Sequence, residues 1–87
     1  MTFAERLRQE LFDQEYMTAD GFDEAIIGYQ RFVSSDLSGV RVCYSVSKCI
    51  DILMRDMPYD DAIEHFMFNV EGAYMGELTP NFIWDNF

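Results

Sequence analysis

An unbroken helical repeat of apolar residues between positions 46 and 57 constrains the fold of this chain more than any other feature. Apolar side chains stand at the first residue and at 3, 4, 7, 8 and 11 positions beyond it, namely Val46, Cys49, Ile50, Leu53, Met54 and Met57. This spacing gathers them on one face of an α-helix. Ser45 or Ser47 is placed to cap its start. We therefore predict an amphipathic helix over 46–57 that must pack against another layer.

A second helical repeat begins directly after Pro58. The apolar members of this repeat are Tyr59, Ala62, Ile63, Phe66, Met67, Val70 and Tyr74. Asp60 and Asp61 fall in its first turn, where the helix dipole favours anions. We predict a second amphipathic helix over 59–72. Pro80 then favours an extended approach to a short final strand at 81–84.

The first half of the chain is less regular. Apolar residues at positions 4, 7 and 11 share one helical face and predict a helix over 3–16. The segment 24–33 fits a helix by its spacing, but its β-branched and aromatic residues and the turn-rich stretch that follows also fit a hairpin with the alternating segment 40–44. Both alternatives are open from the sequence. We choose the hairpin because the strand at 81–84 needs a partner.

These elements together predict an α+β fold in a single domain, residues 1–87. Its parts are an N-terminal helix, a β-hairpin, two amphipathic helices and a C-terminal strand that completes a three-stranded antiparallel sheet. Eight Phe, five Tyr and one Trp supply large apolar surfaces, which allow so short a chain to offset its ordering entropy.

The two cysteines indicate a reducing compartment. Cys43 falls in a predicted strand and Cys49 in a predicted helix, with no second pair to build a metal site, so we expect free thiols.

The chain has no run of about 18 apolar residues that would predict a membrane helix. The first six residues also lack the order of charged and apolar residues of a secretory signal. We therefore expect a cytoplasmic protein.

The net charge of −10 is unevenly distributed along the chain. Residues 31–55 carry a small positive net charge, whereas residues 56–87 carry seven carboxylates and no Lys or Arg. A negative field of this kind repels nucleic acid and anionic membranes and attracts basic protein surfaces. We therefore expect no direct nucleic-acid or membrane partner. The alternative is that the acidity only keeps a 49% hydrophobic protein in solution.

The predicted helix over 59–72 places several carboxylates on one side. At about 100° per residue, Glu64 lies about 40° and Glu71 about 20° from Asp60 around the helix axis. Two apolar side chains fall among these acids, so the candidate partner-binding residues are Asp60, Asp61, Glu64, Phe68, Glu71 and Met75. An apolar anchor ringed by charge is typical of a protein-binding patch. The alternative is that Phe68 packs beneath the N-terminal helix or the hairpin.

The sequence contains two partial motifs for metal binding, but neither is complete. Asp61 and His65 stand four residues apart on a predicted helix, but two ligands without a third make a weak metal site. Residues 13–24 have the length of a calcium-binding loop, yet Met17 and Thr18 stand where a ligand and the turn glycine belong. We expect no enzyme activity, no cofactor and no metal.

Four stretches of the chain follow one another in a characteristic order. They run from Gly21 to Gly28, from Cys49 to Met54, from Asp61 to Glu64, and from Asn69 to Pro80, where the sequence reads Asn-Val-Glu-Gly-Ala-Tyr-Met-Gly-Glu-Leu-Thr-Pro. In these stretches the chain resembles a family of small phage and prophage proteins to which no activity is attached, and the resemblance covers about residues 21–83. This chain has Tyr44-Ser45 where the family tends to have Tyr-Asp. The resemblance implies a phage or mobile-element origin, and so the cytoplasm of a bacterial host cell, and a compact α+β fold.

Two hypotheses for function follow. In the first, the protein binds and inhibits a host protein with a basic surface, as anti-defence proteins such as anti-CRISPR proteins and DNA mimics do. In the second, it is a structural or assembly component of a phage particle or operon. That component would be a homo-oligomer formed through exposed aromatic residues such as Phe12, Tyr16, Trp84 and Phe87.

Overall fold

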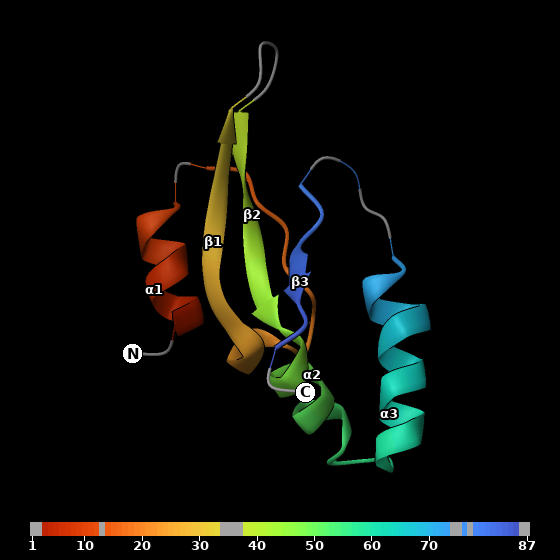
Figure 1. Ribbon diagram of the computed structural model, residues 1–87. Coiled ribbons are helices and arrows are strands. Elements are labelled where there is room, and N and C mark those ends of the chain that lie inside the picture. The colour runs from red at the N-terminus through yellow and green to blue at the C-terminus, as the bar shows by residue number, and fades with distance from the viewer. Residues whose placement is uncertain (1–2, 13, 34–37, 74–75, 77, 86–87) are drawn as a thin grey trace.

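The predicted α+β class is confirmed by the computed structural model, which describes residues 3–12, 14–33, 38–73, 76 and 78–85. Within these residues a three-stranded sheet is flanked by helices (Figure 1). The elements in chain order are α1 (Phe3–Glu10), a 3₁₀ turn (Asp23–Ala25), β1 (Ile26–Val33), β2 (Ser38–Ser45), α2 (Val46–Leu53), α3 (Tyr59–His65), a π-helical continuation of α3 (Phe66–Glu71) and β3 (Asn81–Ile83). None of the helices in the described residues is long and apolar enough to cross a membrane.

The sheet has the strand order β1-β2-β3, and its first pair is the predicted hairpin. The strand alternative for 24–33 is therefore correct from Ile26 onward, after a short 3₁₀ turn. The prediction of a fully antiparallel sheet is wrong, because β3 pairs with β2 in parallel, with Cys43 opposite Asn81 and Ser45 opposite Ile83. The connection from β2 to β3 contains α2 and α3, and a long helical crossover of this kind brings the chain back in the same direction.

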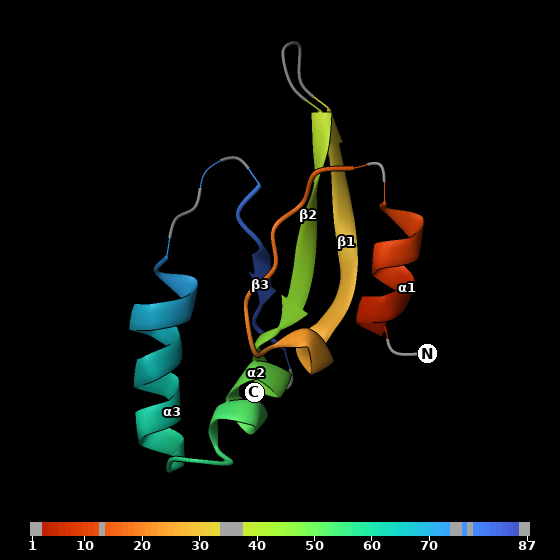
Figure 2. The ribbon, with the colours of Figure 1, turned by 180° about the vertical axis from the view of Figure 1, so that it is seen from behind.

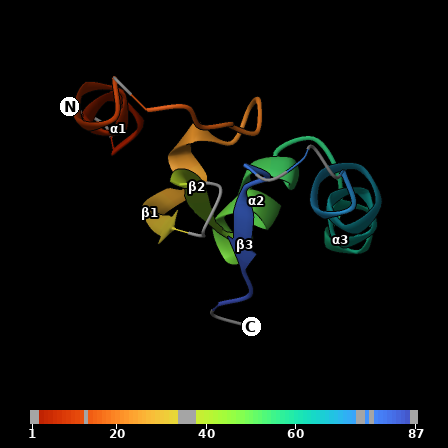
Figure 3. The ribbon, with the colours of Figure 1, turned by 90° about the horizontal axis from the view of Figure 1, so that it is seen from above.

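The N-terminal helix is shorter than the predicted range 3–16. α1 ends at Glu10, and a turn follows in which the Gln14 amide donates to the Leu11 carbonyl at 2.9 Å. Segment 14–22 then runs along the same face of the sheet on which α1 lies (Figures 2 and 3). Tyr16 and Ala19 pack against the core from this irregular segment. Apolar residues beyond position 11 therefore contact the core without forming a helix.

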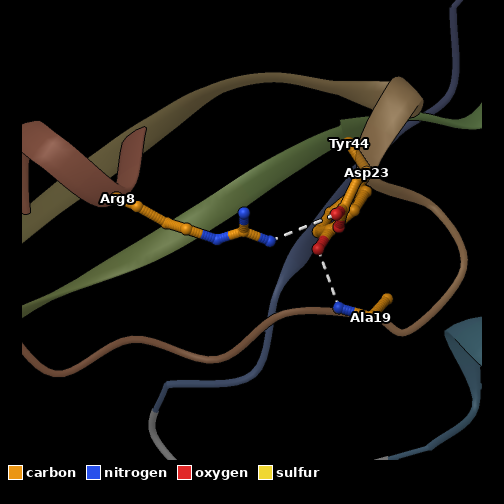
Figure 4. A network of polar contacts seen from close by, with 4 residues as sticks. All are labelled: Arg8, Ala19, Asp23 and Tyr44. Carbon is orange, nitrogen blue, oxygen red and sulfur yellow. Dashed lines mark hydrogen bonds and ion pairs between the residues drawn. The ribbon is translucent and has the colours of Figure 1, made fainter. Parts of the chain in front are cut away.

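Two polar contacts connect this first part of the chain to β2 and to the 3₁₀ turn before β1 (Figure 4). The amide of Ala19 donates a hydrogen bond to the Tyr44 hydroxyl oxygen at 2.7 Å. Arg8 on α1 pairs with Asp23 in the 3₁₀ turn at 3.3 Å. Tyr44 itself is fully buried on β2, and burial raises its pKa to about 12. A buried tyrosine on the central strand thus binds the segment that follows α1 through a hydrogen bond.

The predicted helix over 46–57 forms as α2, with Ser45 as its cap. The Lys48 amide donates to the Ser45 hydroxyl oxygen at 3.3 Å. The regular helix ends at Leu53, and tighter turns continue to Asp56. Met54 is consequently 44% exposed, although the repeat placed it on the apolar face.

Both cysteines are free thiols. Cys49 on α2 is fully buried, and burial raises its pKa to about 12, whereas Cys43 on β2 is half-buried.

The third helix stands beside β3, on the opposite side of the molecule from α1 (Figures 1 and 3). It is attached through Phe66, which is fully buried. The Phe66 ring meets the rings of Phe82 and Trp84 edge to face, with centroids 5.3 and 5.9 Å apart. These contacts fix which side of the helix turns inward and therefore which side turns to solvent.

Candidate functional site: the acidic and aromatic face of α3

The helix that carries the predicted partner-binding residues changes its winding in its middle. α3 ends at His65 and continues as a π-helix over Phe66–Glu71, in which the Gly72 amide donates to the Met67 carbonyl at 3.1 Å. A bond that spans five residues places more residues in each turn than an α-helix does. The count of about 100° per residue therefore applies only to the first part of the helix. Side chains after Phe66 therefore point in other directions than this count gives.

Phe68 points to solvent. Its side chain is 74% exposed, whereas Phe66, two residues earlier, is fully buried. The alternative that Phe68 packs beneath the N-terminal helix or the hairpin is therefore wrong. Met67 is also 45% exposed, and Tyr59 at the start of the helix is 48% exposed. Large apolar side chains thus accompany the carboxylates along this helix.

Phe68 borders an open depression of about 480 Å³. The residues around it are Met57, Asp61, Glu64, His65, Phe68 and Asn69. The structure therefore brings together two predicted carboxylates and the predicted anchor, and we call Asp61, Glu64 and Phe68 the α3 face. Among the described residues, neither carboxylate forms an ion pair with a cation of the same chain. Both are exposed and free to meet a partner's charge.

The other predicted partner-binding residues do not join this depression. Asp60 is exposed in the first turn of α3 but does not line it. Glu71 accepts a hydrogen bond from the Trp84 indole nitrogen at 2.5 Å, which turns it toward the end of β3. Met75 lies outside the described residues. Of the six predicted partner-binding residues, only the three of the α3 face therefore lie together around this depression.

A further carboxylate of the acidic last third also has a structural contact. Asp85 accepts the Ser45 hydroxyl hydrogen, with oxygen separations of 2.7 and 2.9 Å, and the Ser47 amide at 3.2 Å. The hydrogen bond from Ser45 holds the pKa of Asp85 below its usual range. Sequence reasoning missed this role, because the partners are about 40 residues apart and no local pattern links them.

Asn69 borders the depression beside the α3 face and contacts the preceding turn of the helix. Its side-chain nitrogen lies 3.4 Å from the His65 ring nitrogen Nδ1. In the described part of the chain, no three His, Cys, Asp or Glu side chains are grouped so that they could hold a metal ion. The groups that the α3 face presents are two carboxylates and an aromatic ring, which recognise cations and apolar side chains.

Comparison with models of known protein families, with curated proteins and with solved structures finds no match for this chain. The resemblance to phage proteins therefore stays a prediction.

Proposed function

We propose that this protein is a binding module, not an enzyme, and that its α3 face docks on a basic surface of a partner protein. The observation that carries the proposal is the contrast between two phenylalanines of one helix. Phe66 is fully buried, while Phe68 is 74% exposed beside Asp61 and Glu64. An exposed aromatic ring contributes little to folding, but it is a frequent anchor of protein interfaces.

The charge of the protein favours a basic partner both at long range and in direct contact. The net charge of −10 attracts a basic surface from a distance and speeds the encounter. At contact, Lys or Arg side chains can stack on the Phe68 ring and pair with the two carboxylates. Binding through the ring does not depend on charge alone. A complex held by Phe68 should therefore persist in salt that dissociates a purely electrostatic DNA mimic.

The resemblance to phage proteins suggests where to look for the partner. We propose a bacterial cytoplasmic protein with a basic surface, inhibited by this chain in an anti-defence role of the anti-CRISPR kind. The exposed ring favours docking through an apolar anchor over imitation of phosphate spacing, because a mimic of phosphates needs only the charges.

Capture of partners from bacterial lysate tests the proposal. Immobilised protein should retain one or more basic proteins at low salt and, in part, at high salt. Phe68→Ala should abolish the capture. Phe12→Ala is a matched control, because Phe12 is 84% exposed but lies in the segment after α1, outside the α3 face. Equal capture by wild type and Phe68→Ala, or no capture at low salt, would refute the proposal.

A charge reversal tests whether the carboxylates of the α3 face act locally or only through the total charge. Glu64→Lys should weaken capture at low salt, whereas Glu15→Lys makes the same change at an exposed position outside the α3 face. If both reversals weaken capture equally, only the total charge matters and the α3 face is not the docking surface.

The second candidate, a homo-oligomer, is favoured by one observation. Phe12 is 84% exposed and Trp84 is 49% exposed, which are large apolar surfaces for a chain of this size. Tyr16 is half-buried against the core and is therefore a weaker candidate, and Phe87 lies outside the described residues. Light scattering that shows a monomer at high concentration would count against this alternative.

A further inference from the structure

A second cavity opens near the α3 face, between segment 18–22, the end of the π-helix and β3. Its volume is about 260 Å³. Apolar side chains from all three parts of the chain form its walls, namely Ala19, Phe22, Val70, Ala73, Pro80 and Phe82. Phe22 and Pro80 are buried in the protein, so this part of the wall belongs to the folded core and exists before any ligand binds.

Polar groups complete the lining of this cavity. Thr18, Asp20 and Asn69 contribute to it, and all three are exposed, so they lie toward its mouth. Among the described residues that line the cavity, Asp20 is the only charged one. The Ala19 amide is already bonded to Tyr44 and is not available to a ligand. In the part that the described residues form, the cavity is therefore apolar inside and has the Asp20 carboxylate at its entrance.

The cavity and the depression beside the α3 face adjoin at Asn69. Asn69 lines both the cavity and the depression that contains Asp61, Glu64 and Phe68. A partner segment that covers the α3 face therefore passes close to the mouth of the cavity. Phe68 and Val70 stand two residues apart on this helix and point in different directions, so that Phe68 is exposed while Val70 lines the cavity.

We propose that this cavity receives a single arginine or lysine side chain of the partner protein. The aliphatic stem lies against the apolar walls, and the cationic end pairs with Asp20 at the mouth, as long basic side chains do when they bury their stems and keep their charge in water. The inference rests on the proposed function, because it assigns a second contact to the same partner.

Size and charge select this occupant over others. Sites for small-molecule ligands usually enclose about 300–1,000 Å³, so a cavity of about 260 Å³ fits one side chain better than a cofactor. The Asp20 carboxylate and the net charge of −10 disfavour an anionic occupant. The preformed walls lower the cost of ordering the site on binding.

Titration with short peptides tests the inference on the protein alone. The probes are acetylated, amidated tripeptides Gly-Arg-Gly, Gly-norleucine-Gly and Gly-Glu-Gly, added to ¹⁵N-labelled protein and followed by heteronuclear NMR. The arginine peptide should shift the amide signals of Ala19, Asp20, Asn69 and Ala73 in a saturable way. The norleucine peptide should bind about two- to fivefold more weakly, which is the range of an exposed ion pair, and the glutamate peptide should not bind.

Variants locate the binding. Ala73 is exposed and lines the cavity, so Ala73→Leu should fill the space without disturbing the core and should abolish the shifts. Asp20→Asn should weaken the arginine peptide about two- to fivefold and leave the norleucine peptide unchanged. Asp56→Asn, an equal change at an exposed position outside the cavity, is the matched control. Absent shifts, or shifts that survive Ala73→Leu, overturn the inference.

The two proposals fail in distinguishable ways. Peptide binding at the cavity with no dependence of lysate capture on Phe68 contradicts the proposed function alone. Capture that depends on Phe68, with no arginine-specific shifts at the cavity, contradicts the cavity inference alone.

Discussion

The hydroxyl of Ser45 donates its hydrogen to the carboxylate of Asp85, with 2.7 Å between Oγ and Oδ2. Ser45 is the residue that caps α2, and Asp85 lies two residues beyond the end of β3. The Ser45 oxygen also accepts from the Lys48 amide, and Asp85 also accepts from the Ser47 amide. A carboxylate from the end of the chain thus completes the hydrogen bonding of the helix start and lies where the helix dipole favours a negative charge.

Removal of this carboxylate should destabilise the fold. Asp85→Ala leaves the Ser47 amide and the Ser45 hydroxyl without this partner, and we expect the free energy of unfolding to fall by about 1 kcal/mol. Urea denaturation followed by circular dichroism measures the change. Asp56→Ala removes an equal charge from an exposed turn and should change the stability by less than about 0.5 kcal/mol. An equal loss in both variants would mean that the contact with Ser45 contributes nothing.

The same contact should make stability depend on pH in acid. The hydrogen bond from Ser45 lowers the pKa of Asp85 in the folded state, so the folded state favours the ionised carboxylate. This stabilisation is present above the pKa of an unfolded aspartate, about 3.9, and is lost as the pH falls through the lower folded pKa.

The difference in unfolding free energy between wild type and Asp85→Asn isolates this contribution, because the other carboxylates titrate in both proteins. It should be constant from pH 7 to pH 5 and should shrink below about pH 4. A difference that stays constant down to pH 2 would contradict the assignment.

Tyr44 should show the opposite dependence on pH. Burial raises its pKa to about 12, so the folded state favours the neutral phenol. Its contribution to stability is complete below the unfolded pKa of about 10 and is lost as the pH rises toward 12. Tyr44→Phe removes the acceptor of the Ala19 amide and should cost about 1–2 kcal/mol at pH 7. The cost should decrease above pH 10 in urea denaturation, and a cost that rises with pH would refute this account.

Much of the fold could be predicted from patterns that extend over only a few residues. The repeats beginning at Val46 and Tyr59 predicted α2 and the start of α3, because a spacing of three and four residues reports directly on one helical face. The hairpin was predicted from the need of the last strand for a partner. The direction of β3 was not, because it depends on how the crossover through two helices returns to the sheet.

The candidate site shows the limit of the same reasoning. The helical count grouped Glu71 with Asp60 and Glu64 because it assumed one winding throughout, whereas the π-helical turns after His65 direct Glu71 toward Trp84. The same count placed Phe68 among the acids, but it could not exclude that another part of so small a domain covers the ring. The role of Asp85 depends on a contact with Ser45 across the fold, for which the sequence holds no periodic signal. The change of helical winding and the contact between Ser45 and Asp85 therefore decide which of these acids have a partner within the fold.

The contrast between Phe66 and Phe68 gives a paired test of the site. Phe66→Ala removes a fully buried ring that contacts Phe82 and Trp84, and we expect it to lower the free energy of unfolding by about 3–5 kcal/mol. Phe68→Ala removes a ring that is 74% exposed and should change it by less than about 0.5 kcal/mol. Urea denaturation of both variants measures the two losses.

If instead the Phe68 variant loses more than about 2 kcal/mol, the ring belongs to the core and is not available to a partner. A stable, folded Phe68→Ala protein that no longer captures its partner would assign the ring to binding, because folding would then require only Phe66.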